Sequence, residues 1–351
     1  MMETLPRYYT GLDLHKRTIT ATTLDARGET VSQATFRCHP DVLRHYFADC
    51  APPESEHHIV VEATTGWYWV KDALRAAPFT LHLAHARQVK AITSAKVKTD
   101  SADARMLAQL LRNDLLPEAH MISDELRPLR DVLRTRLKLV ERSSAAQNSI
   151  HRLLEKMNVE QVDDLPELMQ LPARCHQEQI VLLQQQIKQL EHSLQAHLVP
   201  DEEVQRLLRI PGIGKINAFT IRLEVDDIAR FESDRQFFSY CRLVPGADNS
   251  AERSRHKRSR EGNRYLKMVF ATASLRAIQY YPEIRSWYQR KKRKKPDALA
   301  RTLVAKELAR IVYQVWTKGE AFNGRFKGEL LSRVKEETWP LLRSPDGLTE
   351  P

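Results

Sequence analysis

The amino-acid sequence predicts an α/β domain with a mixed sheet, followed by long helices and a mainly helical C-terminal domain. Three patterns support this prediction: strand-like alternation over residues 7–38, apolar residues spaced three and four apart over residues 123–200, and a Pro-Gly-Ile-Gly turn at residues 211–214. The chain has 351 residues, of which 42% are hydrophobic, enough for two or three domains. We therefore expect domains at residues 1–122, 123–200 and 201–335, and a tail at residues 336–351.

The first 122 residues alternate between strand and helix patterns in a recognisable order. Three strands rich in β-branched residues come first, and a short helix, a buried apolar strand, a helix, a strand and a final helix follow. The predicted elements lie at residues 8–14, 18–24, 30–36, 40–49, 58–63, 67–77 and 79–84, with the last helix starting near residue 100. This order is typical of a mixed α/β domain of the ribonuclease H type.

Four carboxylates occupy related positions in this predicted domain. Asp13 lies in the first strand, Glu62 ends the buried central strand, and Asp100 and Asp103 share one face of a helical first turn, which Thr99 or Asp100 can cap. A charge in an apolar strand is costly, which favours a functional role for Asp13. Oxygen ligands suit Mg²⁺ or Mn²⁺, and two such ions can clamp the attacking and leaving oxygens in phosphodiester cleavage. Taken alone, Asp100 and Asp103 are slightly better explained as ordinary acidic residues at a helix N-terminus than as metal ligands.

Residues 123–200 read as two long helices separated by a break near Asp163. The second helix is predicted from about Gln177 to His197, with a heptad seam that indicates a coiled-coil hairpin or a dimerisation stalk. An intramolecular helical hairpin with no partner is almost equally compatible with the pattern. The first helix carries basic residues that could face nucleic acid or simply solvent, namely Arg134, Arg136, Lys138, Arg142 and Arg152.

The turn at residues 211–214 has the pattern of a helix-hairpin-helix motif. Gly212 and Gly214 allow backbone N–H groups to approach a phosphate ahead of a helix that begins near Lys215. Such a motif commonly contacts DNA without reading its sequence, although it can also serve only to pack two helices.

A basic segment follows a predicted helix that starts at Phe231 and stops before Pro245. We interpret residues 246–262 as a loop that tracks phosphates, because five cationic residues fall within eight positions: Arg253, Arg255, Lys257, Arg258 and Arg260. Ser250 at its head is a candidate nucleophile. A second basic block, Arg-Lys-Lys-Arg-Lys-Lys, spans residues 290–295 and precedes the apolar helix predicted from Pro296 to Lys318.

Overall composition favours a cytoplasmic, nucleic-acid-binding protein. The formal net charge is +10 and the pI is about 9.4, as expected for a protein with a polyanionic partner. The four cysteines form no Cys-x-x-Cys pair, which argues against a zinc site or a disulfide framework. No apolar run is long enough to span a membrane and no signal sequence is recognisable.

Three N-terminal motifs resemble the signature of the DEDD-type insertion-sequence transposases. They are Thr-Gly-Leu-Asp13, Glu62-Ala-Thr-Thr-Gly and Lys-Thr-Asp100-Ser-Ala-Asp103-Ala-Arg. Pro211-Gly-Ile-Gly, Leu243-Val-Pro and Glu261-Gly-Asn are similar to the C-terminal transposase domain of the same family, which is related to the Piv-type invertases and includes recombinases guided by a bridge RNA. The resemblance covers roughly residues 8–320.

The resemblance implies a RuvC-like domain whose acids Asp13, Glu62, Asp100 and Asp103 bind Mg²⁺ or Mn²⁺. It also implies that Ser250, a few residues after Leu-x-Pro, attacks DNA to form a covalent phosphoserine link. In this family the active site is assembled from residues of different protomers, so the resemblance implies a homo-oligomer, either a dimer or a tetramer. It also implies that the protein acts on DNA and is guided by a structured non-coding RNA.

The chain departs from the family pattern at two positions. Arg242 stands where the family usually has glycine, and Ala251 follows Ser250 where the family usually has serine or glycine, so Ser254 is the second candidate nucleophile. Our leading hypothesis is a DNA transposase or site-specific recombinase of an insertion sequence. The alternatives are a Holliday-junction nuclease that uses metal-activated water at the same acids, and an inactive copy that only binds nucleic acid.

Overall fold

The computed structural model describes residues 5–50, 52, 54–92, 99–244, 246–250, 253–257 and 262–333, with only the backbone described at residues 246–250 and 253–257. The chain divides into two compact units, residues 1–121 and 122–351. Residues 123–200 and 201–333 thus lie in the same unit. Within the described ranges, no helix is long and apolar enough to cross a membrane.

The first unit contains a five-stranded mixed sheet in the order β3-β2-β1-β4-β5. β1 pairs antiparallel with β2, and β2 with β3, whereas β4 runs parallel to both β1 and β5. This is the ribonuclease H-type order that the sequence predicts. The strands are β1 (Arg7–Leu14), β2 (Thr18–Asp25), β3 (Thr30–Arg37), β4 (Glu56–Glu62) and β5 (Phe79–Ala84).

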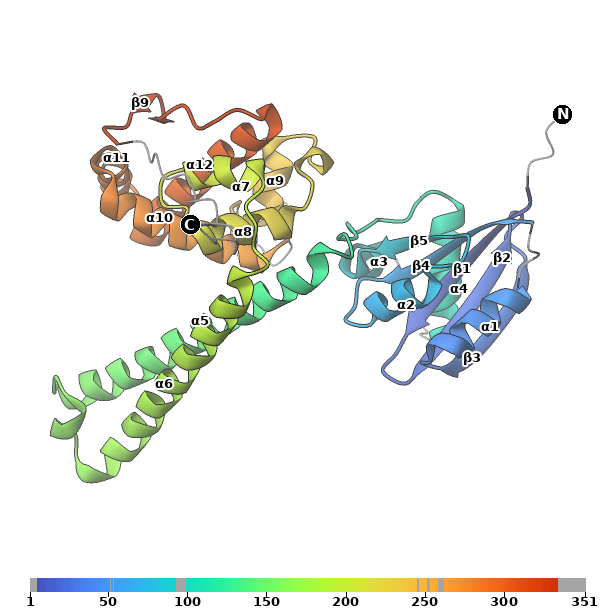
Figure 1. The fold of residues 1–351 in the computed structure, drawn as a ribbon, viewed down its shortest axis with the longest axis horizontal. Coiled ribbons are helices and arrows are strands. Elements are labelled where there is room, and N and C mark those ends of the chain that lie inside the picture. The colour runs from blue at the N-terminus through green and yellow to red at the C-terminus, as the bar shows by residue number, and fades with distance from the viewer. Residues whose placement is uncertain are drawn as a thin grey trace, which may run out of the picture. The chain divides into compact units, whose positions relative to one another are not determined.

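Helices pack on this sheet because each has one apolar face (Figure 1). α1 (Pro40–Cys50) contacts α2 (Trp67–Leu74), and α4 (Asp100–Arg112) packs on β1, β2 and β4. Thr99 caps α4, because its hydroxyl accepts a hydrogen bond from the Ala102 N–H at 3.2 Å. Of the two caps that the sequence allowed, Thr99 and Asp100, the first is confirmed. α3 (Ala86–Ile92), which the sequence did not predict, is too short to show clear periodicity.

The second unit begins with an antiparallel hairpin of α5 (Leu126–Met157) and α6 (Glu167–Gln195), with the 3-10 turn Val162–Asp164 between them (Figure 1). α6 starts ten residues earlier than predicted and contains Pro172 at its sixth position, where proline removes one N–H donor from the helix. α5 and α6 pack against each other, and most of the heptad seam of α6 is half-buried, including Ile180, Leu183 and Ile187.

Two of the basic residues on α5 make ion pairs inside this unit. Arg134 forms a bidentate pair with Glu224, at 2.5 and 2.7 Å, and Arg136 pairs with Glu191 at 2.7 Å. Neither guanidinium is therefore available as a free phosphate contact.

The remaining helices form one continuous apolar core with the base of the hairpin, including Leu133, Leu194 and Leu198. The elements are α7 (Glu202–Leu208), α8 (Lys215–Val225), the 3-10 turn Ile228–Arg230, α9 (Asp234–Tyr240), α10 (Arg264–Tyr280), α11 (Pro282–Lys292), α12 (Asp297–Lys318), β8 (Arg325–Phe326) and β9 (Glu329–Leu330). This arrangement confirms a mainly helical C-terminal region, with a helical hairpin at residues 202–225.

The prediction of a loop at residues 246–262 was wrong in part. β6 (Gly246–Ser250) pairs antiparallel with β7 (Arg253–Lys257), and Ser250 lies opposite Arg253. Basic residues at every second position satisfy the period of a strand, but without alternating apolar residues they carry no strand signal. Ala251, Arg258, Arg260 and the tail at residues 336–351 lie outside the described residues.

Candidate functional site

Two of the predicted acids sit side by side at the end of adjacent parallel strands. The register of β1 and β4 pairs Gly11 with Val60 and Leu12 with Val61, so Asp13 and Glu62 are the next residues along the two strands. Neighbours in this register point to the same face of a sheet. Asp13 and Glu62 therefore face the side on which Val60 packs against α4.

Gly11 brings α4 to this edge of the sheet. A Cβ atom at Gly11 would lie 1.9 Å from the carbonyl oxygen of Ala104 and 2.8 Å from the nitrogen of Ala108, so the helix backbone rests directly on the strand. Ala104 and Ala108 are fully buried, and their small side chains permit this approach. Because Gly11 and Asp13 share a face of β1, the preceding turn of α4 comes to lie beside Asp13, and this turn carries Asp100 and Asp103.

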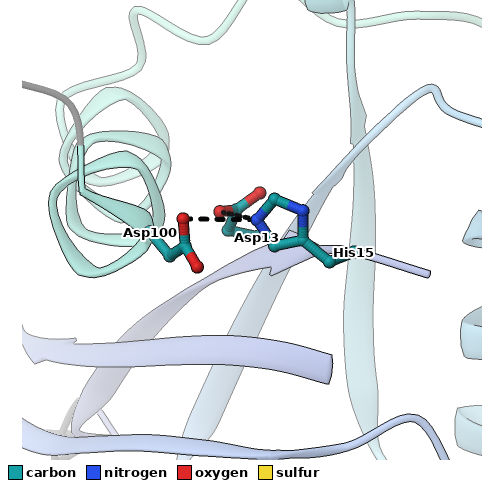
Figure 2. A group of neighbouring side chains, drawn as sticks. All are labelled: Asp13, His15 and Asp100. Carbon is teal, nitrogen blue, oxygen red and sulfur yellow. Dashed lines mark hydrogen bonds and ion pairs between the residues drawn. The ribbon is translucent and has the colours of Figure 1, made fainter. Parts of the chain in front are cut away.

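The resulting cluster joins Asp13 and Asp100 through a histidine that the sequence analysis had not singled out (Figure 2). His15 Nε2 lies 3.1 Å from Asp13 Oδ2 and 3.3 Å from Asp100 Oδ1. The ligand atoms of these three residues all lie within 4.8 Å of one another. Among the described residues this is the group that could share a metal ion, and neither Glu62 nor Asp103 is a member of it.

Burial and two neighbouring carboxylates oppose the negative charge of Asp13. Burial raises the pKa of Asp13, and the negative charges of Asp100 and Asp103 raise it further, while His15 acts in the opposite direction. The charge of Asp13 likewise raises the pKa of His15 above its usual value. Both shifts are those expected where carboxylates lie close together, a setting that favours a cation.

The donor set fits a hard divalent cation. Carboxylate oxygens are the ligands that Mg²⁺ and Mn²⁺ prefer, and an imidazole nitrogen is compatible with Mn²⁺. Burial is the largest cause of the raised pKa of Asp13, and a cation bound to this carboxylate would offset that cost. The four acids lie on β1, β4 and the first turn of α4. The site is half-open to solvent, because the Asp13 side chain is 22% exposed and the Asp100 side chain is 61% exposed.

The two glycines of the helix-hairpin-helix motif have different surroundings. Gly212 has a φ of +76°, and a Cβ there would lie 2.1 Å from the Ala273 carbonyl oxygen of α10, so this glycine is needed for packing. Gly214 has open space around it and precedes the first turn of α8, next to the exposed Lys215. Gly214 and Lys215 are thus the members of the motif that a phosphate can approach.

A buried polar network holds the segment that follows the β6–β7 hairpin. Asn263 donates a hydrogen bond to Glu224 at 2.6 Å, and its side-chain oxygen accepts from the Tyr265 and Leu266 N–H groups to cap α10. Glu224, which is 2% exposed, is also bound by Arg134. Gly262 has a φ of +90°, and a Cβ there would lie 2.5 Å from the Tyr240 carbonyl oxygen. The Gly-Asn pair therefore anchors one base of the hairpin that carries Ser250.

Arg242 anchors the other base and adopts a conformation that favours glycine. Its φ is +55°, and its Nε–H donates to the Gly262 carbonyl oxygen at 2.8 Å. The left-handed backbone at residue 242 suits glycine and disfavours other residues by about 1 kcal/mol. The side-chain hydrogen bond, worth about 1 kcal/mol or more, offsets that strain.

Arg242→Gly is therefore expected to change stability little, whereas Arg242→Ala should lower it by about 1–2 kcal/mol, because alanine keeps the strained backbone and loses the hydrogen bond. Urea denaturation of the two variants beside the unmodified protein measures both differences. Equal losses for the glycine and alanine variants would contradict the role given to the left-handed backbone.

Two residues important to the site's geometry were not identified from the sequence. His15 follows Asp13 by two positions, and this Asp-x-His spacing is the signal that could have found it. Gly11 precedes Asp13 by two positions within a strand, where glycine often marks a close backbone approach. Ser250 and Ser254 lie in β6 and β7 of the second unit, whereas the acids lie in the first.

Two family models match the chain. One, described as a transposase, matches residues 10–159, which include the four acids. The other, described as the transposase IS116/IS110/IS902 family, matches residues 204–289, which include Gly212 and Ser250. Together they span about two thirds of the chain.

Curated relatives resemble the chain over most of its length. The "Probable family 20 transposase" of Pseudomonas aeruginosa is 24% identical over 88% of this chain and 96% of its own. The transposase for insertion sequence element IS1328 of Yersinia enterocolitica is 24% identical over 89% of this chain and 98% of its own. The transposase for IS1111A of Coxiella burnetii is 23% identical over 64% of this chain and 68% of its own. With these matches, the chain belongs to the IS110 family and is a DNA transposase of an insertion sequence.

Proposed function

We propose that the transposase cleaves and rejoins DNA through a divalent metal site at Asp13, Glu62, Asp100 and Asp103 and a serine nucleophile at Ser250. The observation that carries the metal site is the close approach of α4 to β1 at Gly11, which gathers Asp13 and Asp100 within one ligand cluster. Mg²⁺ or Mn²⁺ bound there would stabilise negative charge on the phosphodiester oxygens. His15 is a further donor to the same site.

Each group has a distinct task in this proposal. Asp13 and Glu62 stand on neighbouring rigid strands and set the position of the site, whereas Asp100 and Asp103 enter from α4. The Ser250 hydroxyl attacks phosphorus to form a phosphoserine ester, and the displaced DNA oxygen leaves as a hydroxyl that takes up the proton lost by the serine. Reversal of that step by a second DNA hydroxyl rejoins the strand and releases the serine. Ser254, opposite Asn249 in the β6–β7 hairpin, is the reserve nucleophile.

Several parts of the protein are proposed to contact nucleic acid. Gly214 and Lys215 offer the N-terminus of α8 to a phosphate. The basic segment that carries Arg253, Arg255, Lys257, Arg258 and Arg260 is proposed to hold DNA near Ser250. A structured non-coding guide RNA is proposed from family resemblance alone.

A homo-oligomer, dimer or tetramer, would allow acids and serine to meet across protomers. Exposed apolar side chains on α6 offer a contact surface for such an assembly, among them Leu168, Leu171, Val181 and Leu182.

The nucleophile is tested by trapping the covalent intermediate. With labelled element ends and Mg²⁺, the unmodified protein should yield a DNA–protein adduct that survives denaturation, and Ser250→Ala should yield none. Ser254→Ala is the matched control and should retain the adduct. An adduct that persists in Ser250→Ala would disprove this assignment, while cleavage of four-way junctions without any adduct would instead identify a junction nuclease.

The metal-free protein should become more stable when Asp13 is replaced by asparagine. Because the pKa of Asp13 is raised in the folded state, mainly by burial, the folded protein holds this proton more tightly than the unfolded chain does. Stability therefore falls as the pH rises through the interval from the usual carboxyl pKa of about 4 to the raised value. Above that interval, in EDTA, Asp13→Asn should unfold at a higher urea concentration than the unmodified protein, and the difference should shrink as the pH is lowered.

Addition of Mg²⁺ or Mn²⁺ provides the complementary measurement. Saturating metal, at about 100 times its Kd, should stabilise the unmodified protein by about 2.7 kcal/mol and leave Asp13→Asn nearly unchanged. An asparagine variant that is less stable than the unmodified protein in EDTA, or that gains equally from metal, would contradict a cation site at Asp13.

A further inference from the structure

A basic pocket in the second unit is lined by residues other than the four acids and the β6–β7 hairpin. Its volume is about 510 Å³, within the range of pockets that enclose small ligands. Side chains of α9, α11, α12 and the β8–β9 turn line it, and Phe238, Trp287 and Leu303 supply its apolar surface. No function described above uses this pocket.

The pocket carries an excess of positive charge. Five cationic side chains and one carboxylate line it. The carboxylate, Glu307, is 3% exposed and is already paired with Arg310 and with Lys327, the latter at 2.6 Å. Within the described ranges, Lys291, Lys295 and Lys306 have no carboxylate partner. Three ammonium groups are therefore available to an anion that enters the pocket.

Aromatic rings lie directly beneath two of these ammonium groups. Lys291 Nζ is 5.2 Å from the centre of the Trp287 ring, and Lys306 Nζ is 5.1 Å from the centre of the Phe238 ring. Trp287 itself is held edge-on by the buried Phe326, at 5.6 Å and 83°. The pocket thus combines a fixed apolar surface with cations at its rim.

Sequence spacing explains how one segment builds much of this site. Trp287 and Lys291 are four residues apart on α11, so they lie on a single helical face, and Lys295 follows in the turn after that helix. The basic block at residues 290–295 therefore splits into residues that line the pocket and residues, such as Arg293 and Lys294, that do not.

We propose that this pocket binds one unstacked nucleotide of a single-stranded nucleic acid. The phosphate would pair with Lys291, Lys295 and Lys306, and the base would lie against Trp287 and Leu303. A duplex offers phosphates to surface lysines but keeps its bases stacked, so only a single strand uses both the charge and the apolar surface. The proposal concerns DNA binding or RNA binding alone and is independent of the metal site and of Ser250.

The test compares two double variants of the full-length protein that remove equal charge. The pocket variant combines Lys295→Ala with Lys306→Ala and removes two cations that line the pocket. The control combines Arg293→Ala with Lys294→Ala and removes two cations that do not line it. Binding of fluorescent oligo-dT, oligo-U and a duplex is measured in EDTA as a function of salt, and thermal unfolding confirms that each variant folds.

The pocket variant should lose its contact with one phosphate of a single strand. One such contact contributes about 0.7 to the salt slope, so the slope should drop by about 0.7 and affinity near 0.1 M salt should fall by about fivefold, against about twofold for the control. The larger loss, with oligo-dT or with oligo-U, identifies whether DNA or RNA occupies the pocket. Equal losses for the two double variants, or an equal loss with duplex, would overturn the proposal.

Photocrosslinking supplies an independent readout of the base. Oligonucleotides that carry 5-iodouracil should crosslink to Trp287 in the unmodified protein, and this adduct should disappear in the Lys295→Ala, Lys306→Ala variant while surviving in the control. Crosslinks that map only outside the pocket would also overturn the proposal.

Discussion

Asp103→Ala is expected to abolish DNA strand cleavage while DNA binding remains unchanged or becomes slightly tighter. Asp103 lies in the first turn of α4, and its negative charge is one of those that raise the pKa of Asp13. Loss of a metal-binding acid should remove about 4 kcal/mol of transition-state stabilisation, which corresponds to about a thousandfold in rate. The measurement is cleavage of labelled element ends beside a filter-binding assay with the same DNA.

A control variant separates this effect from a general loss of charge. Asp49→Ala removes an exposed carboxylate from the last turn of α1, a helix that does not carry any of the four acids, and should leave cleavage unchanged. If the alanine variant at residue 103 still cleaved DNA at a similar rate, Asp100 and Asp103 would be ordinary residues of a helix N-terminus.

Gly11→Ala is expected to destabilise the first unit strongly and to abolish cleavage. The added methyl would lie 1.9 Å from a backbone oxygen of α4, and neither the strand nor the helix can give way through a flexible side chain. Overpacking of this kind typically costs about 1–3 kcal/mol, and the backbone contact here places the expected value at or above the top of that range. Chemical denaturation measures the loss of stability, and the cleavage assay measures the loss of activity that displacement of the acids should cause.

Gly214→Ala is the matched control for this substitution. No atom lies within 4 Å of a Cβ at Gly214, and its φ of −98° suits alanine, so stability should change little. Full activity and full stability in Gly11→Ala would show that α4 can move away from β1 without disturbing the acids, which would contradict the role given to this contact.

Asp103→Ala and Gly11→Ala separate the chemistry of the acids from their assembly. Asp103→Ala tests whether the acids carry the chemistry, and Gly11→Ala tests whether the packing of α4 is what assembles them. Loss of cleavage in the first with normal stability, and loss of both in the second, would together support the proposed site.

The sequence by itself determined the order of elements in the first unit. Alternating β-branched residues and helical spacing are local signals, and they predicted the strands and most helices close to their observed bounds. Short motifs around Asp13, Glu62, Asp100 and Asp103 likewise made these acids candidates, because each motif is contiguous in the chain. The strand-poor pattern of residues 246–257 concealed a hairpin, since backbone pairing there does not depend on an apolar face.

Only the tertiary structure decided which of these residues meet. His15 bridges Asp13 and Asp100 because a glycine in β1 lets α4 rest on the strand, and no local pattern encodes a contact between segments almost ninety residues apart. The same holds for Arg134, whose place in a basic run suggested nucleic acid but whose partner is the buried Glu224. Charge alone is ambiguous in a sequence, because a cation serves equally for an internal carboxylate and for an external phosphate until packing shows which lies beside it.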